Sequence, residues 1–355
     1  MLVNPFNLTF GDVPKIYLDK EELSHTVIDK IEYYDYAQSF FITGVRGSGK
    51  TSFLTYISQK LLDNNDNYVI DLMNKKGMIY SLLQQLLSKV KKHRFFDDVS
   101  SIGIASFSFS RQKQMNDDEA ELIQLFEKIK KENKRVIVFI DEVTNNEEIR
   151  ELLQYFSLWK RKEYPIHLVM AGLPEVILEV QNDDRLTFLL RAERITMDYL
   201  NKADMVSQYR KVLNCSLEVA SKMAQLTKGY SYAFQLLGFL CFEATKEGEL
   251  TLETIEKLLP DYQYRLFANV YQKIFLSLSE QDRHYLLAVA EHQTFSEIVS
   301  AMQQSKNYVS QYRRRAIEKG LITPSGHGKV VYTLPFFENY LLEVQNPDSV
   351  YYMGY

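Results

Sequence analysis

The sequence predicts an α/β fold: a parallel sheet with helices on both faces, followed by a helical segment and a C-terminal segment of helices and a hairpin. Three observations predict it. Apolar runs typical of buried strands alternate with amphipathic stretches over residues 1–200. Only helical periodicity continues over 201–274. Over 275–355, helix-length segments precede two short β-rich runs, as in a winged helix-turn-helix domain. These three segments are the expected domains.

The first segment alternates strands with helices, as parallel strands require, because each crossover between them needs a connection of helix length. Strands are expected at 40–43, 67–72, 135–140, 167–172 and 194–197. Helices are expected at 18–34, 52–60, 78–90, 117–131, 147–159, 174–181 and 184–191. The alternating run 102–110 is interpreted as an extra sheet edge, with a hairpin that touches DNA or a neighbouring subunit as the alternative.

The C-terminal segment has helix starts that its capping residues reveal. Ser279 is expected to cap a first helix to about residue 291, and Ser305 a third helix that Gly320 ends. A short helix at about 295–303 lies between them. The strands of the hairpin are expected at 321–323 and 329–333, with the turn at 324–328 between them.

A glycine-rich stretch lies between the first strand and its helix, and it fits G-x-x-x-x-G-K-[ST] at every fixed position. Glycines let the backbone curl so that successive N–H groups point inward, and the helix N-terminus adds partial positive charge. Lys50 is expected to reach the β- and γ-phosphates of ATP or ADP, and Thr51 to offer its hydroxyl to Mg²⁺. The expected nucleotide-binding residues of this Walker A motif are Gly44, Val45, Arg46, Gly47, Ser48, Gly49, Lys50, Thr51 and Ser52.

A second candidate motif, of the Walker B type, follows the apolar strand 135–140, which ends in Asp141 and Glu142. Asp141 is placed to hold the hydration shell of Mg²⁺, and Glu142 to polarise an attacking water. Positioning and charge neutralisation are nearly all that phosphoryl transfer asks of a protein. The alternative is that the two carboxylates cap the next helix.

Residues 201–204 match the guanine-reading pattern N-K-x-D, which would indicate GTP. No D-x-x-G accompanies it, because Asp141 begins the run D-E-V-T. A helix start with Asn201 as its N-cap explains the residues better.

The helix after Ser305 is the candidate for DNA recognition, because it is locally basic. Arginines and lysine could contact phosphates in a major groove, and polar side chains could contact base edges. Three consecutive arginines span about 200° of a helix, so all three cannot face one groove. A solvated basic face or a protein-binding surface is the alternative. The candidate residues are Lys306, Asn307, Ser310, Gln311, Arg313 and Arg314.

Composition limits the classes of function. The 355 residues carry a formal net charge of −4, so any nucleic-acid contact must be local. Cys215 and Cys241 have no metal-ligand spacing and are interpreted as reduced core thiols. No apolar run approaches the length of a membrane span, and the start is not that of a signal peptide, so a cytoplasmic protein without membrane contact is expected.

With these motifs in place, the chain resembles the AAA+ P-loop ATPases. Within them it is similar to bacterial and archaeal relatives of the Orc1/Cdc6 initiators and to the STAND signalling ATPases. The resemblance covers nearly the whole chain. It implies a Mg²⁺-dependent ATPase that acts as a nucleotide-controlled switch, with hydrolysis that is slow or triggered by a partner. It also implies double-stranded DNA as the partner of the winged helix, or in the STAND alternative a protein.

The resemblance also assigns individual residues. Arg191, just before the last strand, stands where such proteins place an arginine that reaches a neighbour's γ-phosphate, with Arg185 as the second choice. Self-association is therefore left open. The run 229–232 resembles the lid motif G-x-P of STAND proteins, with Ser231 where proline would stand. The strand end at 170–172 lacks the usual polar sensor residue.

Overall fold

The computed structural model describes residues 3–9, 11–18, 21–34, 37–97, 115–292, 294–326 and 328–355. The run 102–110, suggested above as a sheet edge, lies outside them. Contacts divide the chain into two compact units. The sheet unit comprises Glu21–Thr43 and Phe53–Thr196. The helical unit comprises Met1–Lys20, Gly44–Ser52 and Met197–Tyr355.

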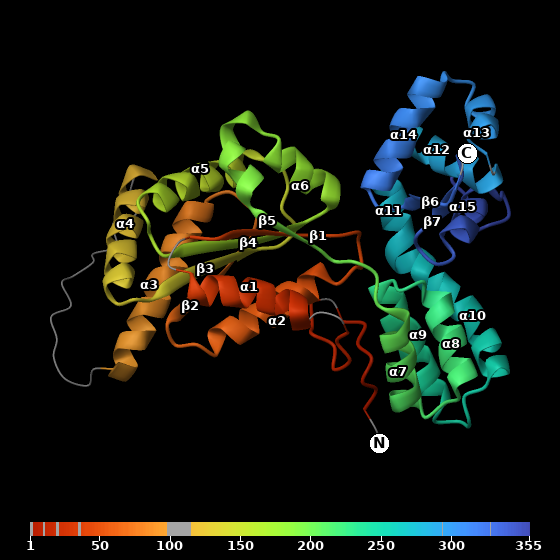
Figure 1. The fold of residues 1–355 in the computed structure, drawn as a ribbon, viewed down its shortest axis with the longest axis horizontal. Coiled ribbons are helices and arrows are strands. Elements are labelled where there is room, and N and C mark those ends of the chain that lie inside the picture. The colour runs from red at the N-terminus through yellow and green to blue at the C-terminus, as the bar shows by residue number, and fades with distance from the viewer. Residues whose placement is uncertain are drawn as a thin grey trace. The chain divides into compact units, whose positions relative to one another are not determined.

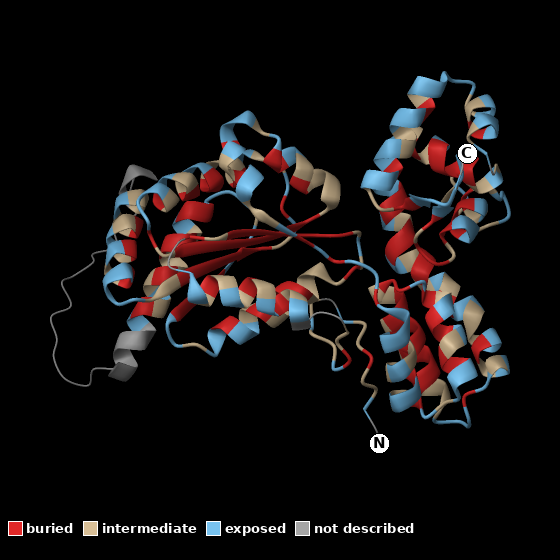
Figure 2. Ribbon diagram, in the orientation of Figure 1, coloured by how far each residue is buried: buried red, intermediate tan, exposed pale blue. Residues whose placement is uncertain are grey.

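A five-stranded sheet in the order β2-β3-β4-β1-β5 organises the sheet unit (Figure 1). Every neighbouring pair of strands is parallel. Nearly all residues of the central strands are buried (Figure 2), as expected for strands covered on both faces. The predicted α/β fold with a parallel sheet is therefore confirmed. The strands are β1 Ser39–Thr43, β2 Asn67–Leu72, β3 Arg135–Ile140, β4 Ile166–Gly172 and β5 Glu193–Thr196.

Helices cover both faces of this sheet (Figure 1). On one face, alternate strand residues such as Ile70, Val138 and Met170 pack into a single apolar cluster with residues of α3, α4 and α5. The helix expected at 184–191 is present as a 3₁₀-helix, η1, with a kink at Leu186. The helices are α1 Glu21–Tyr33, α2 Lys50–Leu62, α3 Met78–Asp97, α4 Met115–Lys131, α5 Glu147–Arg161, α6 Pro174–Gln181 and η1 Asp184–Arg191.

The helical unit begins its long run of helices at Asn201, whose side chain accepts a hydrogen bond of 2.8 Å from the backbone N–H of Ala203. Asn201 therefore has the capping role predicted for it. Gly229, at φ +76°, separates α8 from α9. A single turn of π-helix, η2, joins α10 to α11. The helices are α7 Lys202–Leu213, α8 Leu217–Thr227, α9 Ser231–Ala244, α10 Leu252–Leu266, η2 Phe267–Tyr271 and α11 Gln272–Ser277.

The C-terminal elements follow the predicted order of three helices and a hairpin. Ser279 and Ser305 cap their helices as predicted, and Gly320, at φ +68°, follows the last of the three. The hairpin strands pair antiparallel. A further helix, α15, was not predicted. The elements are α12 Glu280–Glu291, α13 Phe295–Ala301, α14 Lys306–Glu318, β6 Ile322–Pro324, β7 Val330–Tyr332 and α15 Phe337–Gln345.

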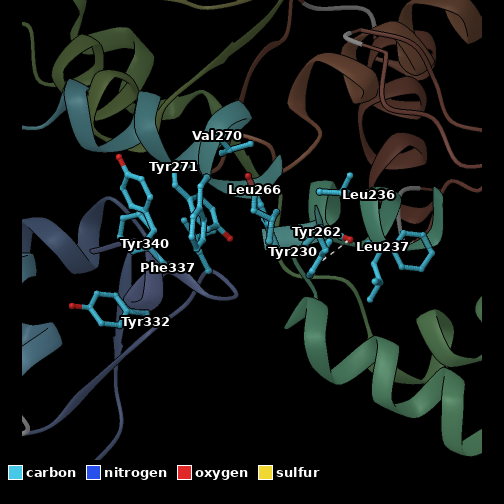
Figure 3. Close-up of a cluster of buried hydrophobic side chains, with 14 of the residues drawn as sticks. Tyr230, Leu236, Leu237, Tyr262, Leu266, Val270, Tyr271, Tyr332, Phe337 and Tyr340 are labelled. Atoms are coloured by element: carbon cyan, nitrogen blue, oxygen red, sulfur yellow. Dashed lines mark hydrogen bonds between the residues drawn. The ribbon is translucent and has the colours of Figure 1, made fainter. Parts of the chain in front are cut away.

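One apolar core runs from α7 to α15, so the helices after 201 and the C-terminal elements are packed together (Figure 3). Tyr271 carries the connection: it is fully buried, and its hydroxyl donates a 2.5 Å hydrogen bond to the carbonyl of Pro335. Its ring also meets that of Phe337, with centroids 5.2 Å apart. No helix in the part of the chain that the structure describes combines the length and apolarity needed to cross a bilayer.

Candidate nucleotide site

The glycine-rich stretch folds into a tight loop that Lys50 closes. The Lys50 ammonium donates to the carbonyls of Gly44, at 2.8 Å, and Val45, at 2.9 Å. The Val45 carbonyl also accepts from the N–H of Ser48, at 3.2 Å. These bonds turn three carbonyl and amide groups toward one another and hold the ammonium at the loop. α2 begins at Lys50, so Thr51 and Ser52 lie in its first turn.

Gly47 shows why this loop needs glycine. Its φ is +77°, a left-handed conformation that other residues rarely adopt. A Cβ atom at this position would also collide with the hydroxyl of Tyr230. Gly49 has a left-handed φ of +93°, but the space around it is open. Gly49 is therefore required by its backbone conformation alone. Gly47 is required both by its conformation and by the close approach of the Tyr230 hydroxyl.

The lid motif contacts the loop directly. The hydroxyl of Tyr230 donates to the carbonyl of Arg46, at 2.6 Å, and the N–H of Tyr232 donates to the carbonyl of Gly47, at 3.2 Å. Burial raises the pKa of Tyr230, so its hydroxyl stays protonated and acts as a donor. The sequence identified 229–232 as a lid motif but gave no sign of these contacts. The contact between Tyr230 and Arg46 joins residues 184 positions apart.

Asp141 and Glu142 follow β3 directly in the sheet unit. Oδ1 of Asp141 accepts a 2.8 Å hydrogen bond from the N–H of Glu142. Glu142 has φ +50°, which is uncommon for a non-glycine residue, and its side chain is exposed. The N-cap of α5 is Asn146, whose side chain accepts from the N–H of Ile149 at 2.9 Å. The alternative in which Asp141 or Glu142 caps this helix is therefore wrong.

Asn74, just after β2, is a polar residue of this region that the sequence analysis missed. Its Nδ2 donates to the carbonyl of Glu142, at 3.3 Å, and to the hydroxyl of Thr144, at 2.8 Å. Its Oδ1 accepts from Asn146 at 2.8 Å. Asn74 thus supports the backbone of Glu142 from the neighbouring strand. Its position one residue beyond Met73, at the carboxyl end of β2, was the available signal.

The strand register places the ends of β1 and β3 at one edge of the sheet. Thr43 is level with Gly172, and Ile140 is level with Met170 on the same strand, β4. Only β4 separates the two ends, so they lie about 10 Å apart in the hydrogen-bonding direction. Gly44 follows Thr43 in the chain, and Asp141 follows Ile140. Carboxyl ends of parallel strands are where open α/β sheets bind ligands.

Arg191 lies at the amino ends of the strands, opposite the carboxyl ends that Asp141 and Glu142 follow. It precedes β5, whose first residue, Glu193, is level with Phe40 near the start of β1. The side chain of Arg191 is exposed. The Glu193 carboxylate pairs with Lys30, at 2.6 Å, so it is not the partner of Arg191. No carboxylate among the described residues forms an ion pair with Arg191.

Arg185, the second choice for this role, is held in a local ion pair. Its guanidinium meets the Asp183 carboxylate at 2.9 Å, and these hydrogen bonds lower the pKa of Asp183 to about 2. Arg150 approaches the same carboxylate at 3.1 Å. The geometry therefore favours Arg191 over Arg185 as the residue available to a partner.

The basic helix α14 presents one polar stripe outward. The exposed residues at helical spacing are Lys306, Asn307, Ser310, Gln311 and Arg314. Arg314 also pairs with Glu318, at 2.7 Å.

The other two arginines of α14 are engaged within the unit. The Arg313 guanidinium lies 5.8 Å from the centre of the Phe295 ring. Arg315 pairs at 2.7 Å with Asp282, whose side chain is only 6% exposed. The expectation that the three consecutive arginines do not all face one side is confirmed. Arg313, seven residues after Lys306, remains a predicted DNA contact.

The oxygen atoms of Thr51 and Asp141 are of the kind that Mg²⁺ prefers. Among the described residues there is no group of three or more His, Cys, Asp and Glu side chains that could hold a metal alone. Mg²⁺ is ordinarily held by one or two carboxylates together with phosphates and water. The residues present therefore fit this ion in company with a nucleotide.

Comparisons with known proteins agree with these features. A family model described as "ATPase domain predominantly from Archaea" matches residues 27–219, more than half of the chain. A second model, a domain of unknown function (DUF8462), matches residues 268–341. A search of curated protein sequences found no match.

Solved structures share the fold at low sequence identity. A Walker-type ATPase of Pyrococcus abyssi superposes with a TM-score of 0.66 at 16% identity, over 95% of this chain and 99% of its own. The Orc2 protein of Aeropyrum pernix, in complexes with ADPNP and ADP, gives 0.61 at 10% identity, over 96% of each chain. Cdc6p of Pyrobaculum aerophilum gives 0.50 at 13% identity, over 96% of each chain. The chain belongs to the family of ATPase domains found predominantly in Archaea, and its fold is that of an Orc/Cdc6-like AAA+ ATPase.

Proposed function

We propose that this chain binds Mg²⁺ and ATP, hydrolyses ATP slowly to ADP and phosphate, and acts as a nucleotide-controlled switch. One observation carries the proposal: the loop 44–51 is held in a tight curl by the Lys50 ammonium and the carbonyls of Gly44 and Val45. Such a loop presents backbone N–H groups and a lysine to phosphate oxygens. The complexes of the Aeropyrum Orc2 protein with ADPNP and ADP support the choice of nucleotide.

The proposed roles follow from chemistry and position. Lys50 neutralises the β- and γ-phosphates, and the hydroxyl of Thr51 and the carboxylate of Asp141 hold Mg²⁺ directly or through water. Bound Mg²⁺ would neutralise charge that develops on the phosphates. Glu142 orients the attacking water, and Asn74 holds the backbone of Glu142 through its carbonyl. The strand register supports this grouping, because the loop and the two carboxylates continue strands that end at one sheet edge.

The binding step is tested by calorimetric titration of ATP into the wild type and Lys50→Ala. The wild type is expected to bind, and Lys50→Ala to bind at least about tenfold more weakly, because charge-assisted contacts to phosphate are among the strongest. Lys60→Ala, which changes an exposed lysine of the same helix, is the control and should match the wild type. Equal affinity of Lys50→Ala and the wild type would contradict the assignment.

The stripe on α14 is proposed to engage double-stranded DNA, within a C-terminal winged helix at 275–355. Its support is the outward-facing set of Lys306, Asn307, Ser310, Gln311 and Arg314. A protein partner, as in STAND ATPases, is the second candidate. The pairing of Arg314 with Glu318 favours that candidate, because it offsets the charge of the stripe. The domains proposed from the sequence are 1–200, 201–274 and 275–355, and the last two share one apolar core.

The salt dependence of DNA binding separates these candidates. The full chain is used, because one core joins α7 to α15. Counterion release predicts that affinity for a DNA duplex falls steeply between 50 and 200 mM salt, with a slope of about −0.9 for each phosphate neutralised. No DNA binding at low salt would favour a protein partner.

A further inference from the structure

We propose that Tyr230 is a positioning residue of the phosphate-binding loop, and that docking of the lid motif 229–232 orients the loop amides that bind phosphate. The inference rests on the proposed nucleotide binding and adds a residue from outside the loop to it. The observation that carries it is the pair of hydrogen bonds from Tyr230 and Tyr232 to the carbonyls of Arg46 and Gly47.

These two carbonyls belong to consecutive peptide units. In a trans peptide, the C=O of one residue and the N–H of the next point in opposite directions. Holding the Arg46 carbonyl toward Tyr230 therefore turns the N–H of Gly47 away from the lid. Holding the Gly47 carbonyl toward Tyr232 does the same for the N–H of Ser48. That second N–H indeed points into the curl, where it meets the Val45 carbonyl at 3.2 Å.

The lid motif is itself held firmly, so its position can be transmitted to the loop. Tyr230 is 1% exposed, and it lies in the continuous core of the helical unit (Figure 3). Its ring packs edge-on to Tyr232, whose hydroxyl accepts from Asn269 at 2.9 Å. The hydroxyl of Tyr230 also occupies the space that a side chain at 47 would need. Loop and lid therefore fit each other at two consecutive peptide units.

This arrangement makes phosphate binding and lid docking reciprocal. If the docked lid presents the amides in the orientation that phosphate requires, nucleotide must in turn favour the docked lid by the same free energy. Removing one neutral hydrogen bond is expected to weaken ADP binding about two- to tenfold. The effect should require the β-phosphate, because the oriented amides serve the phosphate chain and not the base.

The test compares Tyr230→Phe with Tyr209→Phe, both in the full chain. Tyr209 is a matched control: its hydroxyl is also buried and donates to a backbone carbonyl, that of Phe234 at 2.8 Å, but inside the lid. Each substitution removes one hydroxyl and keeps the ring. Thermal unfolding of the nucleotide-free variants measures the structural cost of each. Titration calorimetry, with competition where binding is weak, measures the affinity for ADP and for AMP, which lacks the β-phosphate.

Tyr230→Phe is expected to lower the affinity for ADP about two- to tenfold. The affinity for AMP should change little. Tyr209→Phe should leave both affinities unchanged while it lowers the melting temperature. Wild-type affinity for ADP in Tyr230→Phe would overturn the proposal, as would an equal loss for ADP and AMP. Failure of the wild type to bind ADP would instead contradict the proposed function.

Discussion

Glu142 has a backbone conformation that residues of its type seldom adopt, and such conformations concentrate at functional sites. The residue follows a buried strand, its side chain is exposed, and Asn74 holds its carbonyl. The carboxylate of Glu142 is therefore not needed as a helix cap, because Asn146 caps the following helix. Asp141 and Glu142 could be recognised from sequence because the signal, an apolar strand that ends in two acids, is local. The contacts of Asn74 and Tyr230 could not be predicted, because their partners are distant in the chain.

Asp141→Asn is expected to retain ATP binding but to need more Mg²⁺ for it. The amide keeps the size of the side chain and loses the negative charge that the proposed role requires. Titration of ATP at a series of Mg²⁺ concentrations measures this. Asp71→Asn, on β2, is the control. A Mg²⁺ dependence identical to that of the wild type would show that Asp141 does not contribute to holding the ion.

His167 is predicted to make the stability of the sheet unit depend on pH. Burial and the nearby Arg135 and Lys160 lower its pKa from 6.5 to about 3. Because the folded pKa is depressed, the neutral form stabilises the fold above pH 6.5, and this stability is lost as pH falls toward 3. Between pH 7 and 5, the free energy of unfolding should fall by about 2 kcal/mol from this group alone.

Urea unfolding at pH 7 and pH 5 measures this loss in the wild type and in His167→Gln. The variant lacks the titrating ring, so its difference between the two pH values should be smaller by about 2 kcal/mol. His25→Gln, on α1, controls for general effects of losing a histidine. An unchanged difference in His167→Gln would show that another group is responsible.

At the scale of elements, α14 shows how a helix divides its residues between packing and binding. Periodicity predicted the helix and its cap, and the 200° span of three arginines predicted that they would separate. The contacts of Arg313 and Arg315 are with residues of α13 and α12, so they could not be predicted from the sequence of α14 alone. α15 was missed although Phe337, Tyr340, Leu341 and Val344 have helical spacing, because the segment is short and follows Pro335 and a left-handed Phe336.

Single substitutions in α14 should have unequal effects. Arg314→Ala is expected to lower DNA affinity and to reduce the salt slope by about 1, with little change in stability. Arg315→Ala should destabilise the protein by about 1–3 kcal/mol, because it leaves the buried Asp282 carboxylate without its cation. Fluorescence anisotropy and urea unfolding measure the two properties. Equal, small effects of both on DNA affinity would indicate a nonspecific charged surface.

At the scale of the whole molecule, the sheet unit has its candidate carboxylates at one edge and Arg191 at the other. At this position Arg191 could not act together with the carboxylates of its own sheet. It could reach a nucleotide bound to a second copy of the chain. The sheet and its helices followed from alternating patterns in the sequence. The single core from α7 to α15 did not, because sequence periodicity shows that a helix has an apolar face but not which face covers it.

If Arg191 acts in trans, turnover per subunit should rise with protein concentration. An arginine supplied by a neighbour can be worth about 10³–10⁵ in rate. Arg191→Ala should bind ATP normally and stay slow at every concentration, while Arg161→Ala, at the exposed end of α5, should behave as the wild type. Adding Lys50→Ala subunits, which keep Arg191, should restore activity to Arg191→Ala. A rate independent of concentration, with full activity of Arg191→Ala, would leave a monomeric switch.

Phosphate release at saturating Mg²⁺ and ATP is the most direct test of the proposed ATP hydrolysis. The wild type should release phosphate. Glu142→Gln should bind ATP as tightly and release phosphate at least about 10²-fold more slowly, because the amide cannot accept a proton from water. Glu147→Gln, an exposed acid in the first turn of α5, should match the wild type. Equal rates for Glu142→Gln and the wild type, or no phosphate release by any of them, would contradict the account.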